Sequence, residues 1–266
     1  MKNDEVVKTL QQYFSKDGTM TYKGGDETVK VLTELFATVS PIRYNAPDLF
    51  FVKDSLVLIV EHFEFDCYQR TRKGSSYRLE EARIEREFNA RPMEGDSSVM
   101  HATINAPSSY EYYISNVKQT FDEHYARIDT YVQNLTKIGV VREDSKVKVM
   151  FLIDDVSPLG TMTVDNNVGW GENDRHPIVL GACKDFLDFL SERQKVDYVL
   201  ACSSFGSEPY IWFINQNDLK AYQDTAIDYS IRQFIPFTVN VILGAVKVHK
   251  EEQAYTDDTR AGIEDE

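Results

Sequence analysis

Residues 47–61 carry the sequence PDLFFVKDSLVLIVE, in which two apolar segments flank a short polar turn. The first segment spans residues 49–52, the turn contains Lys53 and Asp54, and the second segment spans residues 56–60. Two apolar runs of this length around a tight turn are typical of a β-hairpin. The second run is apolar at every position, which predicts a central strand that is covered on both faces of a sheet.

An acidic residue stands at each end of this hairpin. Asp48 follows Pro47 at the start of the first strand, and Glu61 lies at the far end of the second strand. The two carboxylates are separated in sequence but can meet across the hairpin. Such oxygen ligands suit Mg²⁺ or Mn²⁺, which are hard cations that keep water available for attack on a phosphodiester. The hairpin therefore predicts Asp48 and Glu61 as ligands of one metal ion.

Helix and strand patterns alternate along the rest of the chain. Helices are predicted over residues 3–15, 26–39, 108–138, 186–190 and 217–229. Strands are predicted over residues 146–154, 196–201 and 210–214, and an apolar segment covers residues 237–248. Ser108 and Glu111 form a capping-box pattern, and residues 93–107 are predicted to be a loop. The whole pattern favours one α/β domain over residues 1–250, with a central mixed sheet flanked by helices and a long helical insertion at about 75–140.

The composition excludes several classes of protein. The chain has 266 residues, of which 42% are hydrophobic, and a net charge of −14. This is enough apolar material for a core, but the net negative charge argues against a protein that is wrapped in nucleic acid. Residues 251–266 are expected to form a flexible acidic tail. Three separated cysteines fit a reducing compartment, and no apolar run is long enough to span a bilayer, so we expect a cytoplasmic protein without a membrane anchor.

One neighbourhood of this acidic chain is distinctly basic, and it covers residues 67–92. A Gly-Ser-Ser loop at 74–76 is followed by alternating acidic and basic residues, as in an exposed helix. Clustered cations are suited to contacts with backbone phosphates, so DNA or RNA is the expected partner. The residues assigned to these contacts are Arg70, Arg72, Lys73 and Arg78. A surface helix held by ion pairs is the competing interpretation.

The order of helix, Pro-Asp, hairpin, acidic strand end, helix and further strands resembles that of the PD-(D/E)xK nuclease superfamily. The resemblance implies a restriction-endonuclease-like core, a Mg²⁺ or Mn²⁺ cofactor, phosphodiester hydrolysis, and catalytic roles for Asp48 and Glu61 as metal ligands. The motif also places a lysine two positions after its acidic residue, but here that position is Phe63. The nearest replacements are Lys73 and Arg70 in the basic loop, and Lys73 is taken as the third catalytic residue.

Three functions are open on the sequence alone. The preferred hypothesis is a divergent metal-dependent endonuclease. Phe63 favours the alternative of a catalytically inactive nuclease-fold module that binds a nucleic acid or a protein, including a second copy of this chain. The third is an α/β protein unrelated to nucleases, in which Asp48 opens a turn and Glu61 is solvated at a strand end.

Other polar residues are assigned structural roles. Asp154 and Asp155 precede Val-Ser-Pro and are predicted to open a turn rather than to bind a metal. The five histidines have no paired ligand spacing, so we expect them on the surface or in the core, with His62 beside the site by proximity alone. The tyrosines of residues 108–138 are predicted to pack with their hydroxyls at the edge of the core.

Overall fold

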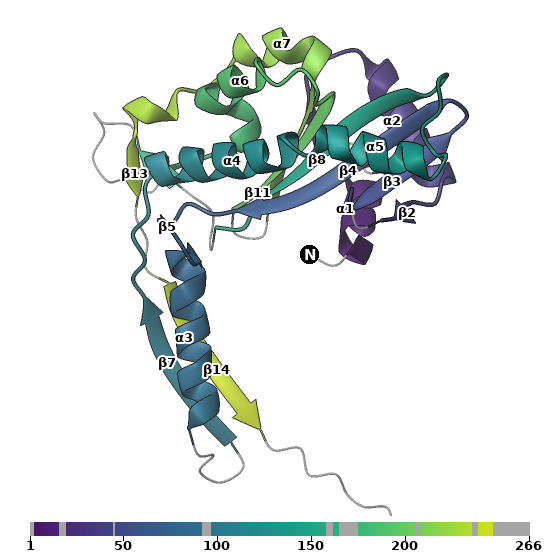
Figure 1. Ribbon diagram of the computed structural model, residues 1–266. Coiled ribbons are helices and arrows are strands. Elements are labelled where there is room, and N and C mark those ends of the chain that lie inside the picture. The colour runs from purple at the N-terminus through teal and green to yellow at the C-terminus, as the bar shows by residue number, and fades with distance from the viewer. Residues whose placement is uncertain are drawn as a thin grey trace, which may run out of the picture.

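A seven-stranded mixed sheet forms the centre of the molecule (Figure 1). The computed structural model describes residues 3–15, 20–44, 46–91, 97–157, 162–164, 175–205, 208–235 and 239–246. The strands, in order across the sheet, are β1 (Met20–Tyr22), β12 (Glu208–Asn215), β11 (Tyr198–Phe205), β8 (Lys146–Asp155), β4 (Leu56–Phe65), β3 (Leu49–Lys53) and β2 (Ile42–Arg43). Strands β4, β8 and β11 are parallel, whereas β3 and β12 run antiparallel to β4 and β11. The predicted α/β class and mixed central sheet are confirmed.

The hairpin predicted from residues 47–61 is strands β3 and β4. Leu49 pairs with Val60 and Lys53 pairs with Leu56, so a two-residue turn joins the strands. Asp54 occupies this turn at φ 53, a left-handed conformation that aspartate tolerates better than most residues. Strand β4 lies between β3 and β8, and its apolar run is buried on both faces, as predicted.

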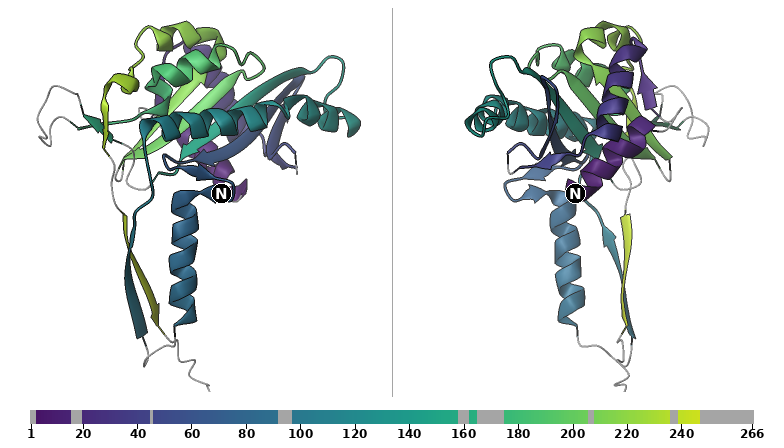
Figure 2. Two further views of the ribbon diagram at one scale, coloured as in Figure 1. Left: turned by 60° about the vertical axis from the view of Figure 1, so that its left-hand side comes forward. Right: turned by 90° about the vertical axis from the view of Figure 1, so that its right-hand side faces the viewer.

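Helices cover both faces of the sheet (Figure 2). One face packs against α1 (Asn3–Ser15) and α2 (Asp26–Thr38). The other face packs against α4 (Tyr110–Tyr125), α5 (Ile128–Lys137), α6 (Lys184–Leu190) and α7 (Leu219–Gln223). Phe121 lies at the centre of the second layer, where its ring is 4.8 Å from that of Phe151 and 5.3 Å from that of Phe189.

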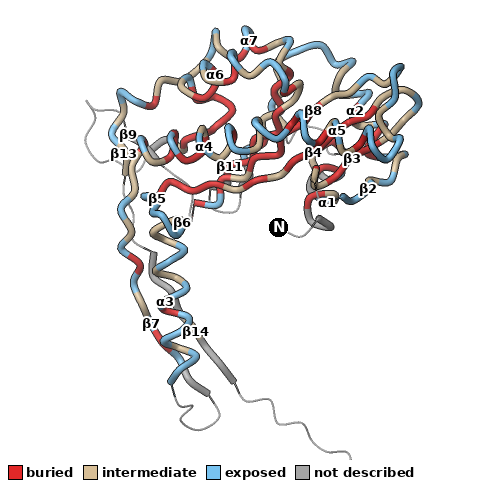
Figure 3. The backbone as a smooth tube through the Cα atoms, viewed as in Figure 1, coloured by how far each residue is buried: buried red, intermediate tan, exposed pale blue. Residues whose placement is uncertain are grey.

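A separate arm projects from the body (Figures 1 and 2). It consists of α3 (Ser76–Ala90) and an antiparallel pair of strands, β7 (Ser97–Ile104) and β14 (Val239–Val246). A small hairpin of β5 (Arg70–Thr71) and β6 (Gly74–Ser75) stands at its base. Among the arm residues whose burial is described, a small cluster of Ile84, Met100 and Ile104 is buried, and most of the others are exposed or intermediate (Figure 3).

Smaller elements complete the fold. A three-stranded sheet contains β10 (Arg175–Pro177), β9 (Met162–Val164) and β13 (Gln233–Ile235). Short 3₁₀ turns span Leu180–Ala182, Gln216–Asp218 and Tyr229–Ile231. None of the helices in the described ranges combines the length and the apolar composition needed to cross a lipid bilayer.

Several predicted elements differ in the structure. The helix predicted over 108–138 is broken at residues 126–127, and its cap is Ser109 rather than Ser108, because the Ser109 side chain accepts from the Tyr112 amide at 3.1 Å. The predicted loop 93–107 contains β7, so the insertion is not helical throughout. The helix predicted over 217–229 is only α7 with flanking 3₁₀ turns. Strand β7 pairs with β14, which is distant in sequence, and no local pattern reveals this pairing. The acidic tail lies outside the described residues.

The aromatic centre of the α4 layer yields a stability prediction. Replacing Phe121 with alanine should lower the free energy of unfolding by roughly 3–5 kcal/mol, because a fully buried ring leaves a cavity that the surrounding rings cannot fill. Urea denaturation measures the change. The control is Val31→Ala on the exposed side of α2, which should change the free energy by less than about 0.5 kcal/mol. Similar losses in both variants would contradict this account of the core.

Candidate functional site

The two acids of the hairpin meet across it. The Asp48 amide donates to Oε2 of Glu61 at 3.1 Å, and the His62 amide donates to Oδ2 of Asp48 at 3.0 Å. This reciprocal contact follows from the register of β3 and β4, in which Leu49 and Val60 are opposite each other. The convergence expected from the sequence is therefore present.

Glu61 is buried and is surrounded by hydrogen-bond donors. The Tyr131 hydroxyl donates to its Oε1 at 2.7 Å, and Nδ1 of His124 lies 2.8 Å from the same oxygen. Burial and the hydrogen bond to Glu61 raise the pKa of the Tyr131 phenol, which keeps its proton on the donor side. A carboxylate this far from water would be costly without donors, and charge-assisted bonds offset the cost. Glu61 is thus not the solvated strand end of the competing interpretation.

The position of the motif's lysine is filled in a different way. Phe63 shares a face of β4 with Glu61, because residues two apart point to the same side of a strand. It is buried, and the imidazole of His124 stacks on its ring with centroids 4.9 Å apart and planes 19° apart. The nitrogen group beside Glu61 on this face therefore comes from α4 and not from β4.

The oxygens of Asp48 and Glu61 are the candidate ligands for a divalent metal. Asp48 accepts from the His62 amide, and both oxygens of Glu61 accept from protein donors. Burial first, and the charge of Glu61 second, raise the pKa of Asp48, because two charged acids side by side are unfavourable. Across the ranges that the structure describes, no group of three or more His, Cys, Asp or Glu residues is placed to hold an ion. In this arrangement the residues do not fit Mg²⁺ or Mn²⁺.

His62 lies on the opposite face of β4 from Glu61. Its Nε2 is 2.9 Å from Oδ2 of Asp154 on the neighbouring strand. The expectation that His62 flanks the site holds only for its backbone, since its amide contacts Asp48.

Cys202 lies near Asp154 on the same side of the sheet. Burial and then the charge of Asp154 raise the pKa of the Cys202 thiol well above its ordinary value, which leaves it a poor nucleophile.

The predicted turn opener Asp154–Asp155 is the end of β8, and only Asp155 makes a turn-type contact, since Asp154 contacts His62. Oδ1 of Asp155 accepts from the Ser157 amide at 2.9 Å. Burial raises the pKa of this carboxyl from 3.8 to about 7. Asp155 is therefore a buried group whose protonation changes near neutral pH.

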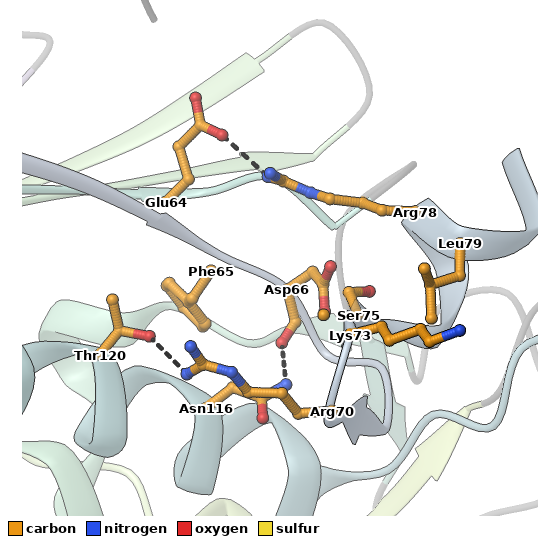
Figure 4. A pocket seen from close by; sticks show the side chains of 11 residues that line it. Glu64, Phe65, Asp66, Arg70, Lys73, Ser75, Arg78, Leu79, Asn116 and Thr120 are labelled. Atoms are coloured by element: carbon orange, nitrogen blue, oxygen red, sulfur yellow. Dashed lines mark hydrogen bonds and ion pairs between the residues drawn. The ribbon is translucent and has the colours of Figure 1, made fainter. Parts of the chain in front are cut away.

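Three of the four predicted phosphate contacts line one pocket of about 380 Å³ at the base of the arm (Figure 4). These are Arg70, Lys73 and Arg78, whereas Arg72 is exposed on the neighbouring turn and is not part of the lining. Lys73 therefore shares a pocket with Glu64 and not with the Asp48 and Glu61 pair. The hydrogen bonds described for Glu61 do not involve Lys73.

The outer part of α3 fits the ion-pair interpretation of the basic segment. Arg83 pairs with Glu80 and with Glu87 along the exposed side of the helix. Such surface pairs contribute little to stability and leave little net charge for a ligand. At the arm base, Arg78 and Arg70 also pair with acids, Glu64 at 2.8 Å and Glu123 at 3.6 Å, whereas no ion pair of Lys73 is found among the described residues.

His124 and Tyr131 were not among the predicted site residues. Local pattern gives no signal for the pair, because His124 lies on α4 and Tyr131 on α5, and the helical structure is interrupted between the two. Tyr131 is fully buried and its hydroxyl reaches Glu61, so the prediction that it packs is confirmed but incomplete.

No protein-family model, curated protein or solved structure matches the chain. The interpretation of the site therefore depends on the geometry of its own residues.

The contacts of Glu61 predict the effect of losing one donor. Tyr131→Phe should lower the free energy of unfolding by about 1–3 kcal/mol, because it removes a hydrogen bond from a buried carboxylate. Urea denaturation at neutral pH measures the loss. The matched control is Tyr210→Phe on β12, where the tyrosine is 37% exposed and the change should stay within about 0.5 kcal/mol. Equal stability of the Tyr131→Phe variant and the wild type would contradict a supporting role for this contact.

The burial of Asp155 predicts a pH dependence of stability. Between pH 3.8 and about 7 the folded protein holds a proton that the unfolded chain releases. The contribution of Asp155 to the free energy of unfolding is therefore complete below pH 3.8. It falls as the pH rises from 3.8 to about 7, by at most about 1.4 kcal/mol per pH unit. The stability of Asp155→Asn relative to the wild type, measured by urea denaturation, should therefore increase as the pH rises from 5 to 8. Parallel pH curves for the two proteins would show that Asp155 ionises normally.

Proposed function

We propose that this protein binds nucleic acid through a nuclease-like core and does not cleave it. The order α2, β3, β4, α4 and β8 is the one that the PD-(D/E)xK resemblance implies, with an acid at the start of β3 and another within β4. Strand β8 lies parallel to β4 on the side away from β3. This arrangement supports a restriction-endonuclease-like core.

The observation that carries the non-catalytic assignment is that protein groups contact both oxygens of Glu61. Its oxygens accept from the Asp48 amide and the Tyr131 hydroxyl and lie against His124. A hydrolytic centre needs carboxylate oxygens that face the substrate and a group placed to transfer a proton. Here the oxygens are turned inward, and the lysine position is a buried phenylalanine.

The base of the arm supports binding. Within the parts of the chain that the structure describes, no ion pair joins Arg72 or Lys73 to an acid. Both residues are exposed on the turn between β5 and β6. In a chain of net charge −14, phosphate contacts require a local group of cations such as this one. A protein partner or a second copy of the chain stays a prediction without a surface assigned to it.

Phosphodiester hydrolysis is the competing function, and one observation favours it. Asp48 and Glu61 do converge, and His124 stands beside them on the same face of the sheet. If the inward hydrogen bonds open on substrate binding, these three residues are the ones that would act. The competing function is therefore tested at the same residues.

Binding and cleavage are measured together on fluorescently labelled single-stranded and double-stranded DNA and RNA, with EDTA and with Mn²⁺. We expect binding under both conditions and no cleavage. The double variant Arg72→Gln/Lys73→Gln should bind roughly tenfold or more weakly, and the slope of log K against log salt should fall by about two in magnitude, because two phosphate contacts are lost.

Two sets of variants complete this experiment. Lys30→Gln/Lys137→Gln removes the same charge from exposed positions on α2 and α5, and should leave binding and its salt dependence unchanged. Manganese-dependent cleavage that disappears in both Asp48→Asn and Glu61→Gln would overturn the non-catalytic assignment. Equal weakening of binding in the two double variants would overturn the binding surface.

A further inference from the structure

The pocket at the base of the arm collects positive groups from three elements. Arg70 comes from β5, Lys73 from the following turn, and Arg78 from the first turns of α3. Two acids, Glu64 and Asp66, also line the pocket, and Nη2 of Arg70 lies 3.6 Å from a third acid, Glu123 of α4. Lys73 forms no ion pair among the described residues, so its ammonium group makes the pocket suited to an anion.

Existing contacts orient two of the cations without using all their donors. Nη2 of Arg78 donates to Oε2 of Glu64 at 2.8 Å, and Nη1 of Arg70 donates to Oγ1 of Thr120 on α4 at 3.2 Å. A guanidinium has five N–H donors in a planar fork, so each keeps further donors for an anion. Figure 4 shows the guanidinium of Arg70 beside Thr120 and that of Arg78 beside Glu64, while the Lys73 side chain extends toward Leu79.

The start of α3 adds an independent feature. Ser75 is the N-cap residue, yet its side chain makes no capping hydrogen bond, and the first turn contains no acid. The Ser75 hydroxyl is shielded from solvent and has no hydrogen-bond partner. Gly74 precedes it at φ 121, a conformation that lets the tight hairpin deliver the helix start to the pocket wall. An anion would satisfy the hydroxyl and complement the positive end of the helix dipole.

We propose that this pocket binds the phosphomonoester of a nucleotide. A monoester carries roughly −1.5 to −2 charges at pH 7 and three terminal oxygens, whereas a backbone diester carries about one charge per phosphate. The three cations of the lining match the charge of the monoester better. The volume of about 380 Å³ lies near the lower end of the range for small-molecule sites, and Phe65 and Leu79 supply apolar contacts for a sugar or base.

Two sources can supply this group: the phosphorylated end of a nucleic-acid strand, and a free mononucleotide. The first source rests on the proposed function, and the second does not. The test measures fluorescence anisotropy with one internally labelled single-stranded oligonucleotide that carries a 5′-phosphate, a 3′-phosphate or neither. AMP binding to the unlabelled protein is measured in parallel by calorimetry.

We expect a terminal phosphate to tighten oligonucleotide binding by roughly tenfold, the effect of one charge-assisted hydrogen bond. Lys73→Gln should remove this preference, whereas Lys30→Gln should keep it. Ser75→Asp is the second variant, since aspartate caps helices well and stabilises them but places a negative charge where the phosphate would lie. It should lose the preference while its thermal stability is unchanged or higher.

The remaining outcomes separate this inference from the proposed function. Oligonucleotides that bind equally with and without a terminal phosphate, together with no AMP binding, would overturn the inference and leave nucleic-acid binding intact. AMP binding that Lys73→Gln and Ser75→Asp abolish, without oligonucleotide binding, would support the pocket and overturn the proposed function. Absence of binding in every arm would overturn both.

Discussion

The carboxylate of Glu61 is held inside the molecule by donors from three segments: the amide of Asp48, the imidazole of His124 on α4 and the hydroxyl of Tyr131 on α5. A buried charge without such donors would be strongly unfavourable, so the hairpin and both helices must keep their relative positions. The break between α4 and α5 lets the two helices follow the sheet while each supplies one donor. The geometry of the whole candidate site depends on this cluster.

The alternation of side chains along β4 divides the polar groups between two layers. Glu61 and Phe63 face α4, whereas His62 and Glu64 face the opposite side. On that side His62 pairs with Asp154 of β8 and Glu64 pairs with Arg78 of the arm. A stretch that looks like one acidic strand end therefore serves two separate sets of contacts. This division explains why acids close in sequence on β4 point to different sides of the sheet.

The arm changes the electrostatics of an acidic chain locally. Its helix neutralises much of its own charge through pairs such as Arg83 with Glu80 and Glu87, while its base brings Arg70, Lys73 and Arg78 to one pocket. The strand pair behind α3 connects the insertion to the end of the described chain. Phosphate recognition at this position would therefore be built on contacts that join the arm to the body, close to β4 but distinct from the Glu61 cluster.

Local pattern was sufficient for the hairpin, the central position of β4, the α/β class and the meeting of Asp48 with Glu61, because strand periodicity and a two-residue turn set these contacts over a short distance. It also identified the basic residues that line the pocket. It failed for β7, whose hydrogen bonds come from β14, and for His124 and Tyr131, whose roles arise only when α4 and α5 pack over β4. The acids could be located from sequence alone, but what they bind depends on donors brought from elsewhere by packing, and in this fold those donors are the protein's own.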